Sequence, residues 1–157
     1  MRSRCTKAGS PTIFFCSAPN RPIQSPDVAA DPITVVLVED NDIFRESLEL
    51  LLSTVPDLRV AAAVADGRSA LEVCRALKPD VVLMDYRLPE LDGVETTVAI
   101  GQACPTTAVV VLTATAESEE IDALYEAGAV ACLTKDRELD DIVGAVRDAA
   151  GRGAALH

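Results

Sequence analysis

Five short apolar runs recur along the chain from Pro32 onward, separated by longer segments of mixed polarity. The runs are Ile33–Val38, Leu58–Ala63, Val81–Met84, Ala108–Leu112 and Val130–Leu133. Their apolar residues are largely continuous rather than alternating with polar ones, which is typical of parallel strands covered on both faces. The pattern therefore predicts five buried β-strands.

The segments between these runs carry apolar residues three and four positions apart, the spacing of one face of an α-helix. The clearest stripes are Phe44, Leu48, Leu51, Leu52 and Val55, then Leu71, Cys74 and Leu77, and finally Leu139, Ile142, Val143 and Val146. We expect Pro56 to end the first helix, since proline does not continue one. Gly128 is expected to cap the helix that contains Ile121–Ala127.

Strands and helices alternate strictly between residues 32 and 153, which we interpret as one domain. Such alternation predicts right-handed crossovers and an open, doubly wound α/β fold with a five-stranded parallel sheet. Ligands of these sheets bind beyond the carboxyl ends of the strands, where the strand order reverses. If the order is 2-1-3-4-5, the first and third strands are neighbours there.

Charged and polar residues stand where the predicted strands end. Glu39 and Asp40 follow the first strand, Asp85 the third, Thr113 the fourth, and Lys135 lies just beyond the fifth. Two carboxylates roughly 4 Å apart repel by about 4 kcal/mol at an effective dielectric constant near 20. A cluster of three therefore calls for a cation, and Mg²⁺ is a hard ion commonly shared between carboxylates and a phosphate.

Each of these residues also has a simpler explanation. An acidic residue after a strand often caps the following helix, as one of Glu39–Asp42 would do here. Thr113 alone is a common strand residue, and a single lysine is usually a solvated surface charge. The occurrence of all five at one end of one sheet favours a functional site over coincidence.

The composition narrows the classes of function. The 157-residue chain has a formal net charge of −11, which disfavours direct binding to nucleic acid because phosphate contacts need a basic surface. Its five cysteines lack the short spacing of zinc or redox motifs. We therefore predict a reducing, cytoplasmic setting. No apolar segment is long enough to span a membrane.

The two ends of the chain differ from the rest. Residues 1–31 are rich in proline and serine without a sustained period, which predicts a disordered leader. Residues 154–157 are predicted to form a short tail. The single histidine, His157, is its last residue and is not expected to be a ligand.

Four segments carry a specific resemblance: Val35–Asn41 (VVLVEDN), Pro79–Gly93 (PDVVLMDYRLPELDG), Val111–Ala114 (VLTA) and Leu133–Asp136 (LTKD). With them, the chain from Ile33 to about Gly153 resembles the receiver domain of two-component response regulators. The intervals from Asp85 to Thr113 and Lys135, 28 and 50 residues, are similar to those of the NarL/LuxR-type subgroup. The resemblance implies a flavodoxin-like fold with strand order 2-1-3-4-5.

The resemblance also implies roles for individual residues. Asp85 would accept a phosphoryl group from a histidine kinase or a small phosphodonor. Glu39, Asp40, Asp85 and the backbone carbonyl of Arg87 would hold Mg²⁺. Lys135 would pair with the phosphoryl charge, and Thr113 would move to hydrogen-bond it. The domain would then be a phosphorylation-dependent switch that catalyses its own phosphorylation and dephosphorylation, not an ordinary enzyme.

Two departures from the family pattern affect the expected output. The position three before the lysine is usually aromatic, whereas here it is Cys132, which cannot relay the movement of Thr113 by swinging a ring. We interpret Cys132 as a buried strand residue in preference to a redox sensor. Arg87 and Thr115 occupy the variable positions that flank the site and govern the access of water to it.

Two other functions remain open from the sequence. A receiver-like interaction module that is never phosphorylated is one; the intact acidic set and Lys135 disfavour it. A haloacid-dehalogenase-type phosphatase is the other, but that class needs a second aspartate two residues after the nucleophile, where this chain has Arg87.

We expect the output to pass through the surface formed by the predicted fourth helix, fifth strand and fifth helix, to another protein or a second copy of the chain. The sequence stops where the NarL/LuxR-type subgroup would begin a linker and a DNA-binding module. Either the protein is truncated or it is a stand-alone receiver, and the absence of a basic reading helix favours the latter.

Overall fold

The computed structural model describes residues 31–115 and 117–155. The predicted leader, apart from Asp31, and His157 lie outside the described residues. The boundaries proposed for the leader and the tail therefore stay predictions.

The described chain alternates strand and helix in the predicted order. The strands are β2 (Ile33–Val38), β3 (Leu58–Val64), β4 (Val81–Asp85), β5 (Ala108–Thr113) and β6 (Ala131–Thr134). The helices are α1 (Asp42–Ser53), α2 (Gly67–Leu77), α3 (Gly93–Ala103), α4 (Ser118–Ala127) and α5 (Leu139–Ala155).

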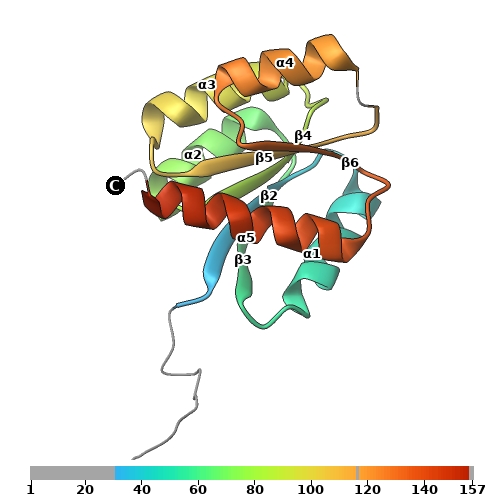
Figure 1. The fold of residues 1–157 in the computed structure, drawn as a ribbon, viewed down its shortest axis with the longest axis vertical. Coiled ribbons are helices and arrows are strands. Elements are labelled where there is room, and N and C mark those ends of the chain that lie inside the picture. The colour runs from blue at the N-terminus through green and yellow to red at the C-terminus, as the bar shows by residue number, and fades with distance from the viewer. Residues whose placement is uncertain (1–30, 116, 156–157) are drawn as a thin grey trace, which may run out of the picture. The chain divides into compact units, whose positions relative to one another are not determined.

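The strands form one parallel sheet in the order β3-β2-β4-β5-β6. Counted from Ile33, this is the predicted order 2-1-3-4-5, and the prediction is confirmed. In Figure 1, α1 and α5 cover one face of the sheet, while α2, α3 and α4 cover the other. The carboxyl ends of β2 and β4 thus lie side by side, which brings the residues that follow them together.

Two apolar layers hold the helices on the sheet. Val35 and Leu37 of β2 pack in the layer beneath α1 and α5, whereas Val36 and Val38 pack in the layer beneath α2, α3 and α4. Every residue of β4 and β5 is buried. The continuous apolar runs therefore reflect strands covered on both faces, as predicted, and the edge strands β3 and β6 are more exposed.

Helices α1, α2 and α3 begin at side-chain caps supplied by the loops at the carboxyl end of the sheet. The carboxamide of Asn41 accepts a hydrogen bond from the amide of Phe44 at the start of α1. Asp92 accepts one from the amide of Glu95, and the Glu95 side chain bonds back to the Asp92 amide in a capping box. These caps fix where the loops leave the strands.

The helix ends follow the sequence closely. α4 ends at Gly128, whose φ of 117° lies in the left-handed region, as predicted. α1 ends at Ser53, before Pro56, because Thr54 already closes its last turn with bonds from its amide and hydroxyl to Leu51. None of the described helices combines the length and apolar character that crossing a membrane requires.

Candidate functional site

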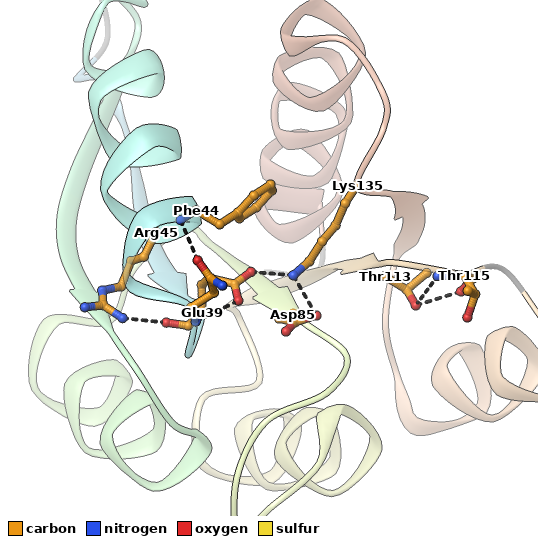
Figure 2. A network of polar contacts seen from close by, with 8 residues as sticks. Glu39, Phe44, Arg45, Asp85, Thr113, Thr115 and Lys135 are labelled. Atoms are coloured by element: carbon orange, nitrogen blue, oxygen red, sulfur yellow. Dashed lines mark hydrogen bonds and ion pairs between the residues drawn. The ribbon is translucent and has the colours of Figure 1, made fainter.

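Five of the predicted site residues lie at the carboxyl edge of the sheet: Glu39, Asp40, Asp85, Thr113 and Lys135. Figure 2 shows four of them, Glu39, Asp85, Thr113 and Lys135. Val38 pairs with Met84, so Glu39 and Asp85, the next residue on each strand, are neighbours. Thr113 ends β5 and pairs with Thr134 of β6, which directly precedes Lys135. Parallel strand ends thus collect residues separated by up to 96 positions in the chain.

Three carboxylates form a compact acidic cluster. Glu39, Asp40 and Asp85 each offer an oxygen, and these oxygens lie within 4.8 Å of one another. Glu39 and Asp85 are buried, with 2% and 6% of their surfaces exposed, whereas Asp40 is open to solvent. Hard oxygen donors gathered in this way fit a cation such as Mg²⁺.

The Lys135 ammonium bridges the two buried carboxylates. Its Nζ lies 2.7 Å from Oε2 of Glu39 and 3.3 Å from Oδ1 of Asp85, and 4.6 Å from the centre of the Phe44 ring. Burial opposes the lysine charge, but the hydrogen bond to Glu39 and the charges of Asp85 and Glu39 outweigh it and raise the pKa of Lys135. The ammonium therefore stays charged and offsets part of the carboxylate repulsion.

Glu39 is held at three points. Its Oε1 accepts a hydrogen bond from the amide of Asn41 at 3.1 Å, its Oε2 accepts one from Lys135, and its backbone carbonyl accepts one from Nη1 of Arg45 at 2.8 Å. Burial raises the pKa of Glu39 and the charge of Asp85 adds to this, while the bonds from Lys135 and Asn41 act in the opposite direction. The Glu39 carboxylate is therefore rigidly oriented.

Asp40 and Asp85 each have carboxylate oxygens that could accept a further ligand. Within the described residues, neither the Asp40 carboxylate nor Oδ2 of Asp85 takes part in a hydrogen bond or ion pair. Asp85 is the last residue of β4, at the point where the loop toward α3 begins. These oxygens are the ones available to a metal ion or to an incoming electrophile.

Thr113 lies at the same edge but bonds away from the acidic cluster. Its hydroxyl donates to the carbonyl of Thr115 at 2.7 Å and accepts from the Thr115 amide at 3.3 Å, as Figure 2 shows. The backbone of Thr113 holds the site together in another way, because its carbonyl accepts a 2.8 Å hydrogen bond from the Lys135 amide.

Arg87 directs its side chain toward α4. Its Nη2 lies 3.7 Å from Oε1 of Glu120, and 68% of its side chain is exposed. The loop that carries Arg87 is anchored where the amide of Gly93 donates to the carbonyl of Tyr86 at 2.8 Å. The role of the Arg87 carbonyl as a metal ligand stays a prediction.

Cys132 lies in β6 beside Val111 and is partly buried. Burial raises the pKa of its thiol, although a hydrogen bond with Tyr125 acts in the opposite direction. A thiol that stays protonated is a poor nucleophile. This environment supports the interpretation of Cys132 as a strand residue.

Sequence reasoning does not identify Phe44 and Arg45 as parts of the site. The apolar pattern explains Phe44 as part of the stripe of the first helix, and it gives Arg45 no role beside the acidic pair. Their positions one turn after that pair are the available signal, since the first turn of a helix that follows a strand end faces the same edge of the sheet. Glu120 carries no signal, because its contact depends on how α4 packs.

The parallel sheet with an acidic cluster and a lysine at its carboxyl edge defines a receiver-type signalling domain. The match to a family model confirms this: residues 35–147 match the response regulator receiver domain. The chain therefore belongs to the response regulator receiver domain family, whose members act as phosphorylation-dependent signalling switches.

Curated relatives include transcriptional regulatory protein DegU from Brevibacillus brevis, 32% identical over 130 residues, which covers 83% of this chain and 55% of DegU. Transcriptional regulatory protein LnrK from Bacillus subtilis is 39% identical over 124 residues, or 79% of this chain and 56% of LnrK. The chain thus spans about half the length of these relatives.

Solved structures with the same fold include the signal receiver domain of a NarL response regulator from Mycobacterium tuberculosis. Its TM-score is 0.74 at 34% identity, over 78% of this chain and 98% of that one. The receiver domain of the sensor histidine kinase PA1611 from Pseudomonas aeruginosa has a TM-score of 0.69 at 29% identity, over 76% and 98%. That domain holds a magnesium ion in its active-site cleft.

Proposed function

We propose that Asp85 is the phosphoryl acceptor of this receiver domain and that Mg²⁺ bound by the acidic cluster assists the transfer. The observation that carries the proposal is the juxtaposition of three carboxylates within 4.8 Å with an ammonium group 3.3 Å from Asp85. Negative and positive groups are thus arranged around one partly free carboxylate. This is the charge distribution that phosphoryl transfer requires.

The donor we propose is a phosphohistidine on a sensor histidine kinase, or a small phosphodonor. A carboxylate oxygen of Asp85 attacks phosphorus and forms an O–P bond while the P–N bond to the imidazole breaks. The electron pair of that bond stays on the imidazole nitrogen. The signal ends by hydrolysis: water attacks the same phosphorus, the O–P bond to Asp85 breaks, and inorganic phosphate leaves.

The residues present fit Mg²⁺. Asp40 and Asp85 have carboxylate oxygens without partners among the described residues, and Glu39 lies in the same cluster. The magnesium ion in the PA1611 receiver supports the assignment. The backbone carbonyl of Arg87 is proposed as a further ligand. When bound, the ion supplies positive charge that neutralises phosphoryl oxygens.

Lys135 and Thr113 complete the proposed site. The Lys135 ammonium, already beside Asp85, would pair with the phosphoryl group once it is attached. The Thr113 hydroxyl would exchange its bond to the Thr115 carbonyl for one to a phosphoryl oxygen. Because Thr113 starts from a bonded state, that exchange reorganises the loop that leads into α4.

The partners and the setting belong to the same proposal. We assign the domain to the cytoplasm, as the target of a histidine kinase, with α4, β6 and α5 as the surface that meets an output protein or a second copy. The relatives DegU and LnrK, of which the matched region covers 55% and 56%, are named as transcriptional regulatory proteins. For this chain we propose output through protein contacts rather than through direct binding to nucleic acid.

The proposal is tested by incubating the chain with acetyl phosphate and Mg²⁺ and measuring the intact mass and the labelled peptide. We expect one phosphoryl group on Asp85, and none without Mg²⁺. Asp85→Asn should lose the label. Asp80→Asn is the matched control, since Asp80 lies at the opposite end of β4 and bonds to Thr34; it should keep the label.

An Asp85→Asn variant that acquired the same label, or a native chain that acquired none under any phosphodonor, would refute the assignment. The second result would favour a receiver-like module that acts without phosphorylation.

A further inference from the structure

Arg87 and Glu120 connect the loop after the acceptor to α4. Arg87 follows Asp85 by two residues, and its Nη2 lies 3.7 Å from Oε1 of Glu120 in the first turn of α4. The Arg87 guanidinium also lies over the Tyr86 ring, 5.9 Å from its centre. A single arginine therefore links the loop that directly follows the acceptor strand to the first turn of α4.

Arg87 is the cation paired with Glu120. The second oxygen of Glu120, Oε2, is buried and has no hydrogen-bond partner among the described residues. The Tyr86 side chain also forms a hydrogen bond with Glu120, but it is neutral, and the same helical turn carries a second carboxylate, Glu119. A buried carboxylate oxygen without a partner is unfavourable, and a nearby guanidinium offsets part of that cost.

The start of α4 is otherwise weakly held. Glu117 and Ser118 are exposed, and the neighbouring Thr113 hydroxyl is bonded within its own loop. In β6, Cys132 stands where receivers usually have an aromatic side chain. A thiol has no ring to rotate, so Cys132 cannot relay a movement of Thr113 to α4 in that way.

Phosphorylation would place a strong competitor for the guanidinium on Asp85, two residues before Arg87. A phosphoryl group carries nearly two negative charges and offers several oxygens in the geometry that a guanidinium binds best. The Arg87–Glu120 pair is largely exposed on the arginine side, and exposed ion pairs are weak and easily exchanged. The new charge would also repel the acidic first turn of α4.

We infer that Arg87 transmits phosphorylation to α4: Glu120 holds the guanidinium in the unphosphorylated chain, and a phosphoryl group on Asp85 draws it away and releases the first turn of the helix. The inference rests on the proposed function, because it requires Asp85 to be the acceptor. It assigns to an arginine–glutamate exchange the coupling that Cys132 cannot provide.

The test uses amide NMR spectra of the whole chain with and without Mg²⁺ and beryllofluoride, a phosphoryl mimic. Glu120→Gln removes the charge that holds Arg87. In Glu120→Gln without beryllofluoride, we expect the α4 amide signals to have chemical shifts close to those that the native chain shows only with beryllofluoride. Adding beryllofluoride to this variant should then shift them little, while the amides around Asp85 still respond.

Glu90→Gln is the matched control. Glu90 forms a comparable exposed pair with Arg68, at 3.2 Å, from the same loop that carries Arg87 but toward α2. This variant should leave the α4 amides and their beryllofluoride response unchanged. In addition, the α4 amide signals of the double variant Arg87→Gln with Glu120→Gln should have the same chemical shifts as those of each single variant. Substitutions of two residues that act through one interaction do not have additive effects.

Native α4 positions in unmodified Glu120→Gln, together with a full beryllofluoride response, would overturn the inference. So would additive effects in the double variant. Failure of the proposed function gives a different result: the native chain itself would take no label on Asp85, and its amides around Asp85 would not respond to beryllofluoride.

Discussion

Arg45 donates a hydrogen bond from Nη1 to the backbone carbonyl of Glu39 at 2.8 Å, and its Nη2 lies 2.6 Å from Oδ1 of Asp42. The arginine side chain is 18% exposed. One guanidinium therefore ties the acidic turn between β2 and α1 to the first turn of the helix. It fixes the backbone of Glu39, the residue that precedes Asp40 in the acidic cluster.

Replacing Arg45 should weaken the binding of Mg²⁺ as well as the fold. Arg45→Gln loses the hydrogen bond from a charged donor to the Glu39 carbonyl, worth about 1.5 to 3 kcal/mol, and the exposed pair with Asp42, worth about 0.5 kcal/mol or less. We expect a lower free energy of unfolding in urea and a higher Kd for Mg²⁺ by calorimetric titration. Arg147→Gln, which breaks the Arg147–Asp57 pair far from the cluster, should leave the Kd unchanged. Equal Mg²⁺ affinity in both variants would contradict a positioning role for Arg45.

Lys135 acts as an internal counter-ion for Glu39 and Asp85. Lys135→Met leaves the two buried carboxylates facing each other, and breaking such a pair costs about 3 kcal/mol or more. Urea unfolding with a chelator should show this loss, and saturating Mg²⁺ should restore part of it because the ion replaces the missing charge. If the variant were as stable as the native chain without metal, Lys135 would not be compensating the cluster.

Gly93 is required where the loop after β4 meets α3. A Cβ at this position would lie 2.9 Å from the Tyr86 carbonyl oxygen, closer than such atoms approach. We expect Gly93→Ala to lower the free energy of unfolding by about 1 to 3 kcal/mol through overpacking. Gly101 lies in the same helix, and a Cβ added there would meet nothing within 4 Å. Gly101→Ala should therefore stabilise the protein by up to about 1 kcal/mol; similar losses in both variants would rule out this explanation.

The Arg147–Asp57 pair predicts a pH dependence of stability. The hydrogen bond from Arg147 lowers the pKa of Asp57 below its usual 3.8. Between the two values the unfolded chain binds more protons than the folded one, so stability rises with pH. The stabilisation is present above pH 3.8 and is lost as the pH falls through the folded pKa.

Unfolding of the native chain and of Arg147→Gln should be compared from neutral pH into the acid range. We expect the difference in stability between them to be constant near neutrality and to shrink below pH 3.8. Arg68→Gln serves as the control, because it removes an exposed ion pair with Glu90 and leaves the Arg147–Asp57 pair intact. A difference that is the same at every pH would show that the pair contributes through packing alone.

The sequence pattern was sufficient to predict the parallel sheet and the polar residues at its carboxyl edge, and the resemblance to receiver domains supplied the strand order. Continuous apolar runs such as Val81–Met84 are typical of strands covered on both faces, and their alternation with helices favours parallel crossovers. Once the strands are parallel and ordered, Glu39, Asp85 and Lys135 must meet at the same edge. These predictions are robust because they depend on backbone topology.

Tertiary structure decided where the side chains at that edge point and which of them bond. Lys135 bridges Glu39 and Asp85, Thr113 bonds to Thr115, and Arg87 turns toward Glu120. Each of these contacts depends on the competition among nearby charges and on the packing of helices such as α4. The distance of α4 from the sheet cannot be predicted from the sequence of the helix itself. The positions of the functional residues therefore follow from the order of the strands, whereas their bonds follow from what the complete fold packs around them.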